Sequence, residues 1–184
     1  MSNLSTKTRW KVATASALSL GMTFIDQTAL NVALPSIQQQ LNMSSTALHW
    51  VINAYLLTLT IFLVMGGNLG DRIGKKKTFV IGASLFALAS FTSALSPSGI
   101  ALIISRGLQG IGGALMIPNS TAITISTFPD NMRGKVMGTL LGFTSIFLIL
   151  GPLLGGLLTQ YLSWRYVFWL NIPVAIASIT MMLK

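Results

Sequence analysis

The chain contains no cysteine and no glutamate, and its 184 residues include only three acidic residues and one histidine. Without cysteine, disulfide bonds and thiolate metal sites cannot form. A single histidine and three scattered aspartates also provide neither a metal-ligand set nor the residue pair of a protease site. Charged residues make up only 8% of the chain, against roughly 25% in soluble domains. We therefore expect no metal, no cofactor and no enzymatic activity.

The chain instead consists mostly of long apolar segments. Hydrophobic residues make up 52% of the chain, and its mean hydropathy is +0.72. Segments of about 20 residues, enough to cross a bilayer as a helix, recur along the whole chain. They predict an all-α membrane protein with a single bundle of six transmembrane helices, the first of them ending at Pro35. The expected helices span residues 12–34, 49–69, 78–95, 100–125, 136–161 and 166–183.

The basic residues indicate how the bundle is oriented. The net charge of +9 is compatible with nucleic-acid binding, but the charges lie in short loops between apolar segments, which excludes that function. Ten of the twelve basic residues fall on the side that holds both termini, while the opposite loops hold only Arg165. Cytoplasmic loops carry this excess of Lys and Arg, so we expect both termini in the cytoplasm and a multi-pass protein in the plasma (inner) membrane.

Two ionisable residues, Asp26 and Arg106, lie inside predicted helices. Each costs at least about 2.5–3.5 kcal/mol at a helix centre, so each needs a specific reason to be there. Counted from the helix ends, both lie roughly 10–14 Å below the same membrane surface at about 1.5 Å per residue. Having opposite charge and similar depth, they can pair or share a wet cavity. One interpretation is an ion pair that only fixes helix packing; the other is a proton- or cation-responsive site in a water-accessible cleft.

Polar and small residues accompany Arg106 on one helix face. Gln109, Gly110 and Gly113 follow it at positions i+3, i+4 and i+7. Small residues allow a second backbone to come close, and a buried arginine needs acceptors close by. Asn31 lies five residues after Asp26, about 140° around its helix, so it fits an interhelical hydrogen bond as well as it fits ligand contact.

The sequence from Gly67 to Lys77 joins two apolar segments and is expected to form a tight turn on the cytoplasmic surface. Its glycines permit a tight reversal and its cations set the topology and contact anionic lipid. Topology alone does not explain an aspartate among those cations. The residues singled out here are Gly67, Gly70, Asp71, Arg72, Gly74, Lys75 and Lys76.

A second small-residue motif lies in the fifth predicted helix. Gly151 and Gly155 are one turn apart and form a groove for helix packing. Pro152 removes one backbone donor and bends the helix, and Gly156 completes the motif. Such a groove is either a generic packing surface or the seal of a pathway between helices.

These motifs together resemble the major facilitator superfamily. The turn resembles that family's loop between helices 2 and 3, residues 102–118 resemble its proton-coupled helix-4 motif, and residues 147–156 resemble its antiporter motif, with Phe147 replacing the usual first glycine. Residues 25–35 and 164–173 are similar to the fourteen-helix branch of the multidrug:proton antiporters. The chain therefore resembles the N-terminal half of such a transporter, a six-transmembrane-helix bundle.

The resemblance implies proton-coupled efflux of drugs or other amphipathic compounds. Asp26 would bind a proton or cationic substrate, Arg106 would tune its protonation, and Gln109 and Asn31 would belong to the same site. Asp71 and Arg72 would latch the cytoplasmic side, and the glycines of the fifth helix would prevent leak. The expected partners are the lipid bilayer, protons, an amphipathic substrate and a second six-helix bundle. The alternative is a membrane interaction or assembly module, or a truncated remnant, without transport of its own.

Overall fold

The computed structural model describes residues 5–183, and this part of the chain folds into six α-helices. Serines begin three of the helices, because the side chains of Ser5, Ser44 and Ser98 each accept a hydrogen bond from the backbone N–H three residues further on. The expected all-α fold with six helices is confirmed. The helices are α1 (Thr6–Gln40), α2 (Ser45–Ile73), α3 (Lys75–Ala94), α4 (Gly99–Thr127), α5 (Asp130–Tyr161) and α6 (Arg165–Leu183).

The end of α1 differs from the prediction. The helix continues through Pro35 to Gln40, so the expected polar loop at 36–47 is reduced to residues 41–44. Proline lacks the N–H that would bond to the carbonyl of Asn31. Both Asn31 and Pro35 are exposed, so the carbonyl left without a partner lies at the surface, where it does not require a protein donor.

The connection between α2 and α3 is also shorter than predicted. Gly67 and Gly70 are helical residues of α2 rather than turn residues, and Gly74 alone joins the two helices. Gly74 has φ of 102°, a left-handed conformation that favours glycine. Gly70 is buried against the side chain of Asn119, and a Cβ there would collide with it, so this glycine serves helix packing.

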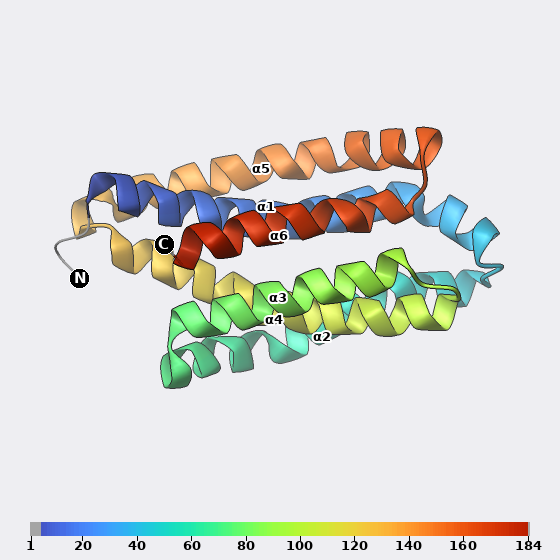
Figure 1. Cartoon of the computed structure of the whole chain (residues 1–184), viewed down its shortest axis with the longest axis horizontal. Coiled ribbons are helices and arrows are strands. Elements are labelled where there is room, and N and C mark those ends of the chain that lie inside the picture. The colour runs from blue at the N-terminus through green and yellow to red at the C-terminus, as the bar shows by residue number, and fades with distance from the viewer. Residues whose placement is uncertain (1–4, 184) are drawn as a thin grey trace.

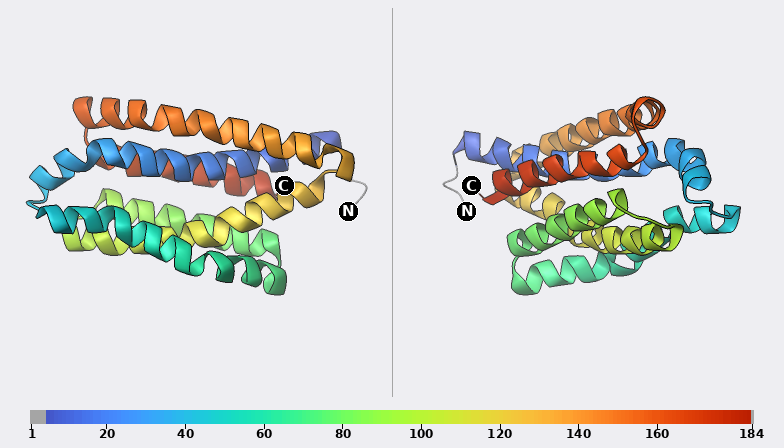
Figure 2. Two further views of the ribbon diagram at one scale, coloured as in Figure 1. Left: turned by 180° about the vertical axis from the view of Figure 1, so that it is seen from behind. Right: turned by 45° about the vertical axis from the view of Figure 1, so that its right-hand side comes forward.

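The six helices form two layers of three. Figure 1 shows α5, α1 and α6 in one layer and α3, α4 and α2 in the other, and Figure 2 shows the same division from two further directions. Contacts of α3 with α6 and of α1 with α4 join the layers. The start of α1, the end of α6 and the α2–α3 and α4–α5 connections lie at one end of the bundle (Figure 1). We call it the basic end because it carries Lys75, Lys76 and Lys77 at the start of α3.

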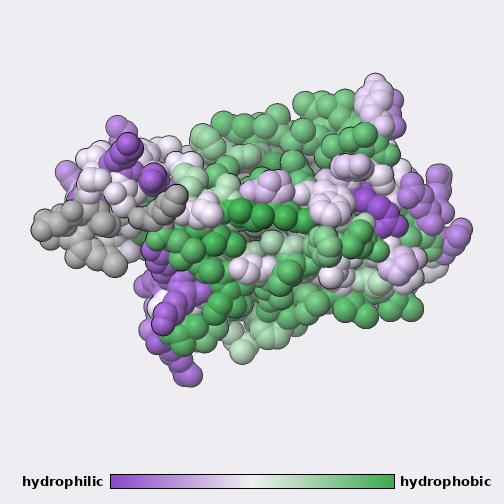
Figure 3. All heavy atoms as spheres, viewed as in Figure 1, coloured by the Kyte–Doolittle hydropathy of each residue, from purple (hydrophilic) through white to green (hydrophobic). Residues whose placement is uncertain are grey.

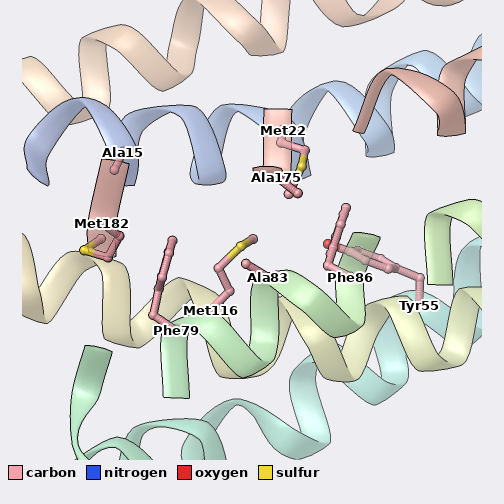
Figure 4. Packing of buried hydrophobic residues seen from close by; sticks show 9 residues of the cluster. All are labelled: Ala15, Met22, Tyr55, Phe79, Ala83, Phe86, Met116, Ala175 and Met182. Carbon is pink, nitrogen blue, oxygen red and sulfur yellow. The ribbon is translucent and has the colours of Figure 1, made fainter. Parts of the chain in front are cut away.

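A hydrophobic core fills the space between the layers. Met22 of α1 and Ala175 of α6 face Met116 of α4 and Phe86 of α3 (Figure 4), and all four are buried. Nearer the basic end, Ser16 of α1 accepts a hydrogen bond from Thr124 of α4 at 2.7 Å and donates one to the carbonyl of Ser120 at 3.0 Å. The core therefore combines apolar packing with buried hydroxyl links between the layers.

The outside of the bundle is largely apolar. The space-filling view in Figure 3 is mostly green along its length and purple towards the ends. Large side chains such as Val64 of α2 and Ile149 of α5 are 71% and 75% exposed, as expected for contact with lipid. By length and hydropathy, α2 to α6 each qualify as a membrane span. α1 does not, because Asp26, Gln27 and Asn31 lie in its middle, but it runs between α5 and α6 along the length of the bundle (Figure 1).

Candidate functional site

The carboxyl group of Asp26 lies at the centre of a buried polar cluster between the two layers. Its Oδ2 accepts a hydrogen bond from Nη1 of Arg106 at 2.5 Å. Its Oδ1 accepts one from Nε2 of Gln109 and one from Nδ2 of Asn171, each at 2.8 Å. Asp26 has no exposed surface. Both carboxylate oxygens therefore have donors, and an ionised Asp26 is well stabilised in this position.

Arg106 is held by groups from three helices. It is 1% exposed, and besides Asp26 its Nη1 donates to Oε1 of Gln109 at 2.7 Å. Its Nε donates to the carbonyl of Val51 on α2 at 3.2 Å. Its guanidinium carbon lies 4.4 Å from the centre of the Tyr55 ring and 5.8 Å from that of Phe168. Two aromatic faces and three acceptors thus compensate for the loss of water around this cation.

A serine on α3 completes the cluster. Oγ of Ser90 accepts hydrogen bonds from Nε2 of Gln109 at 2.9 Å and from Nδ2 of Asn171 at 3.2 Å. We call Asp26, Ser90, Arg106, Gln109 and Asn171 the Asp26 cluster. Its members come from α1, α3, α4 and α6, so one hydrogen-bond network connects both layers at the same depth.

The charges of the Asp26 cluster cancel when Asp26 is ionised. Breaking such a buried pair by removing one partner is strongly destabilising, by about 3–5 kcal/mol, because a lone charge is left in a low-dielectric interior. Protonation of Asp26 removes its negative charge but leaves Arg106 bonded to Gln109 and to the Val51 carbonyl. The site therefore gains one net positive charge when it binds a proton. It also loses the electrostatic attraction between Asp26 on α1 and Arg106 on α4.

A small pocket reaches the cluster from the side of Arg106. Its volume is about 100 Å³. On its wall, the side chain of Gln27 donates a hydrogen bond from Nε2 to the Tyr55 hydroxyl at 3.4 Å. Gln109, by contrast, bonds to Asp26 and does not line the pocket. One of the two interpretations of Asp26 and Arg106 was a site in a water-accessible cleft. The side chain of Asp26 is fully buried, and the pocket borders Arg106 instead. The pocket is lined by Gln27, Leu30, Asn31, Ile52, Tyr55, Leu56 and Arg106.

The structure brings together three of the four residues expected at the coupling site. Asp26, Arg106 and Gln109 bond to one another. Asn31 lies on another wall, where it lines the small pocket and is exposed. This agrees with the 140° rotation between Asn31 and Asp26 along α1.

The residues singled out around the α2–α3 connection lie far from the Asp26 cluster, at the basic end. Asp71 forms an ion pair with Lys75 at 3.3 Å, one helical turn away, and its side chain is 69% exposed. Nζ of Lys76 donates to the carbonyl of Leu183 at 3.0 Å, joining α3 to the last residue of α6. Arg72 is exposed. Asp71 is therefore accessible to other groups, since an exposed ion pair contributes little free energy.

The glycines of α5 pack against α1. A Cβ on Gly155 would lie 2.5 Å from the carbonyl oxygen of Ala29, and one on Gly151 would collide with the side chain of Thr28. Gly156 is half-buried near Val32, and Pro152 is exposed. The small-residue motif thus lets the backbones of α1 and α5 come close three residues beyond Asp26.

Sequence reasoning did not assign Asn171, Ser90 or Tyr55 to the site. Asn171 is the most informative omission, because an uncharged amide within an apolar helix, two residues before Pro173, usually faces a protein partner. Ser90 carries no comparable signal, since serines are frequent in these helices. Tyr55 is visible only as one aromatic residue of α2, and its position over Arg106 depends on the rotation of that helix.

A membrane-spanning helical bundle whose interior holds one compensated charge pair belongs to the class of proteins that handle ions or polar solutes. A sequence model described as Major Facilitator Superfamily matches residues 16–184. The chain therefore belongs to the major facilitator superfamily, whose members are transporters rather than enzymes.

Several drug-resistance proteins are similar to the chain. The tetracenomycin C resistance and export protein of Streptomyces glaucescens is 38% identical over 170 residues, which cover 92% of this chain and 32% of that protein. The methylenomycin A resistance protein of Bacillus subtilis (strain 168) is 35% identical over 164 residues, 89% of this chain and 35% of its own length. A putative multidrug resistance protein MdtD of Escherichia coli O81 (strain ED1a) is 39% identical over 187 residues, 100% of this chain and 39% of its own length.

A solved structure confirms the fold. A crystal structure of a peptide transporter POT superposes with a TM-score of 0.83 at 16% sequence identity, covering 96% of this chain and 37% of that one. At this identity the likeness concerns the fold alone. The chain spans about a third of the length of the relatives that it matches, and it corresponds to the N-terminal half of a major facilitator fold.

Proposed function

We propose that this chain forms the N-terminal bundle of a proton-coupled antiporter that exports drugs or other amphipathic compounds. The observation that carries the proposal is the Asp26 cluster. One carboxyl group receives hydrogen bonds from α4 and α6 and shares partners with α3. Its protonation therefore changes the forces on both layers of the bundle at once. The resistance and export proteins among the relatives support efflux as the direction of transport.

The exchange would proceed through the charge of Asp26. A proton entering from outside neutralises Asp26 and leaves Arg106 with one uncompensated positive charge, which disfavours a bound cationic compound. Loss of the proton to the cytoplasm restores the ion pair and the substrate site. The pocket beside Arg106, with Gln27, Asn31 and Tyr55 on its walls, is the part of this bundle that offers polar contacts to the substrate.

Transport by this mechanism requires a second six-helix bundle, with the substrate between the two. The exposed apolar side chains of α2 and α5 provide a surface for it. Asp71 and Arg72 would form part of a cytoplasmic latch with that bundle, which is consistent with the exposure of Asp71. The close packing of Gly151 and Gly155 on α1 would seal the pathway against leak. Both termini would lie in the cytoplasm and the helices in the inner membrane.

A membrane interaction or assembly module is the second candidate. It is favoured by the complete burial of Asp26 and by the donors on both of its oxygens, because such a pair also serves packing alone. The two functions differ in what the proton does. A packing module needs the ion pair but has no use for protonation of Asp26.

The substitution Asp26→Asn in the complete transporter tests the proposal. The amide keeps the size of the side chain but cannot exchange a proton. In membrane vesicles with an imposed proton gradient, we expect proton-driven export of an amphipathic fluorescent cation to fall at least tenfold, while counterflow without a gradient persists. Proton-driven export that keeps its rate and pH dependence in Asp26→Asn would refute the mechanism. Dye movement that appears in liposomes only when a second bundle is supplied together with the 184-residue chain would reject the assembly module.

A further inference from the structure

A crevice separates α1 from α5 in the half of the bundle near the basic end. Its volume is about 190 Å³, and most of its wall is apolar. It lies far from the Asp26 cluster, with which it shares no residue. The crevice is lined by Trp10, Ala13, Thr14 and Ala17 of α1 and by Val136, Thr139, Leu140 and Phe143 of α5.

The crevice exists because α1 and α5 pack differently in their two halves. Gly155 and Gly151 bring the two backbones together beyond Asp26. Nearer the basic end, the glycines of α5 do not face α1, since a Cβ on Gly134, Gly138 or Gly142 would meet nothing within 4 Å. Larger side chains separate the helices there and leave an apolar gap.

The crevice lies on the side of α5 that faces α6. Phe147, one turn beyond Phe143, packs against the buried cluster of Ile25, Ala29 and Val167, and Val167 belongs to α6. The three glycines with open space around them lie on the other side of α5. The crevice is therefore reached from the apolar outside of the α5–α1–α6 layer, where lipid chains are.

Each wall of the crevice carries a lysine about one turn nearer the basic end. Lys7 lies three residues before Trp10 and seven before Thr14, on the same face of α1. Lys135 lies four residues before Thr139 on α5. Both lysines are exposed, and the ion pairs in the described part of the chain involve Lys75, Arg106 and Arg133 instead. The entrance of the crevice is thus positively charged.

Trp10 fixes the depth of the crevice in the membrane. Trp10 is 37% exposed, and its ring packs edge-on against Phe128 with the ring centres 5.4 Å apart. Tryptophans of this kind lie at the level of the lipid headgroups. An apolar gap below this level and two lysines above it match the two parts of a phospholipid, its acyl chain and its phosphate.

We propose that this crevice is a binding site for an anionic phospholipid of the membrane leaflet at the basic end. One acyl chain occupies the gap between α1 and α5, and the phosphate lies between Lys7 and Lys135. Basic pockets between transmembrane helices on the cytoplasmic side bind such headgroups. The site depends on the apolar gap and the two lysines, so it stands independently of the proposed transport function.

Photocrosslinking of the 184-residue chain in nanodiscs tests the site. The probes are phosphatidylglycerol and phosphatidylcholine that carry the same diazirine-labelled acyl chain. With phosphatidylglycerol, we expect crosslinked peptides concentrated in residues 10–17 and 136–143, and several times fewer with phosphatidylcholine. Crosslinks spread evenly over the apolar surface, equal labelling by the two lipids, or unlabelled crevice peptides would each overturn the proposal.

Matched variants separate the site from general electrostatics. The double substitution Lys7→Gln/Lys135→Gln should lower phosphatidylglycerol crosslinking in the crevice, by about fivefold for each lysine. Arg72→Gln/Lys77→Gln removes the same charge from another part of the basic end and should leave it unchanged. Thr139→Phe narrows the crevice from its exposed rim and should reduce labelling by both lipids, whereas Leu141→Phe should not. Equal effects of the two double variants, or of Thr139→Phe and Leu141→Phe in chains of equal melting temperature, would contradict the assignment.

Discussion

At the scale of single residues, the stability of the Asp26 cluster depends on matching Arg106 with its acceptors. We expect Arg106→Ala to destabilise the bundle by about 3–5 kcal/mol, because it leaves a buried carboxylate without its cation. Arg106→Lys should recover only part of the loss, since lysine has no planar fork to reach Asp26 and the Val51 carbonyl together. Unfolding of the detergent-solubilised chain, followed by circular dichroism, measures both effects.

The exposed pair of Asp130 and Arg133 is the matched control. These residues lie 2.8 Å apart at the start of α5, and their side chains are 87% and 47% exposed. Asp130→Asn should change the unfolding free energy by less than about 1 kcal/mol. If Arg106→Ala were as stable as Asp130→Asn, the buried pair would contribute no more to the unfolding free energy than the exposed pair.

Asn171 has a different task, because it stabilises the charged form of Asp26 without carrying charge. Its amide donates to the carboxylate at 2.8 Å. Asn171→Leu removes one donor while nearly keeping the volume. We expect it to destabilise the detergent-solubilised chain by about 1.5–3 kcal/mol, because a buried carboxylate loses a hydrogen bond. An unfolding free energy equal to that of the unchanged chain would indicate that this hydrogen bond contributes nothing.

At the scale of helices, the contact between α1 and α5 depends on Gly155. Gly155→Ala places a Cβ 2.5 Å from the carbonyl of Ala29, whereas Gly138→Ala on the same helix meets nothing within 4 Å. Both variants gain the same helix propensity. We therefore expect Gly155→Ala to be less stable than Gly138→Ala by about 1–3 kcal/mol in the isolated chain. Equal thermal unfolding of the two variants would mean that α1 and α5 separate at no cost.

The number and order of the helices could be predicted from the sequence, whereas the end of α1 could not. Hydropathy placed six helices in the right order, because a bilayer requires long apolar segments whatever their packing. Counting residues from the helix ends also placed Asp26 and Arg106 at one depth, and the structure brings them into contact. The predicted end of α1 was wrong because a proline does not always end a helix. α1 continues through Pro35, where the freed carbonyl of Asn31 lies at the exposed surface, and α4, α5 and α6 each contain a proline as well.

Rotation of the helices about their axes was the information that the sequence did not provide. Asn171 reaches Asp26 only because α6 turns this face towards α1, and Ser90 joins them only because α3 packs against α6. The charged sequence between α2 and α3 was predicted to form a tight turn that includes all three glycines, because they look alike in sequence. Packing distinguishes them, since Gly70 contacts Asn119 and only Gly74 has a positive φ.

At the scale of the whole molecule, the inner and outer faces of the two helix layers differ in polarity. The faces between the layers hold the Asp26 cluster and the methionine-rich core (Figure 4). The outer faces are apolar (Figure 3) and are available to lipid and to the proposed second bundle. The lysines gather at one end, so the electrostatic asymmetry of the molecule runs along the helices and across the membrane.

That asymmetry predicts the orientation of the chain in the membrane. Because the chain has no cysteine of its own, single substitutions report accessibility without background. Thr46 lies at the start of α2 at the end opposite the basic end, and Asn131 lies at the start of α5 at the basic end; both are exposed. We expect a membrane-impermeant maleimide to label Thr46→Cys in intact cells and Asn131→Cys only after lysis, and the unchanged chain in neither case. The reverse pattern would place the basic end outside, against the potential that attracts lysine and arginine to the cytoplasmic leaflet, and the proton would then have to reach Asp26 from the opposite side.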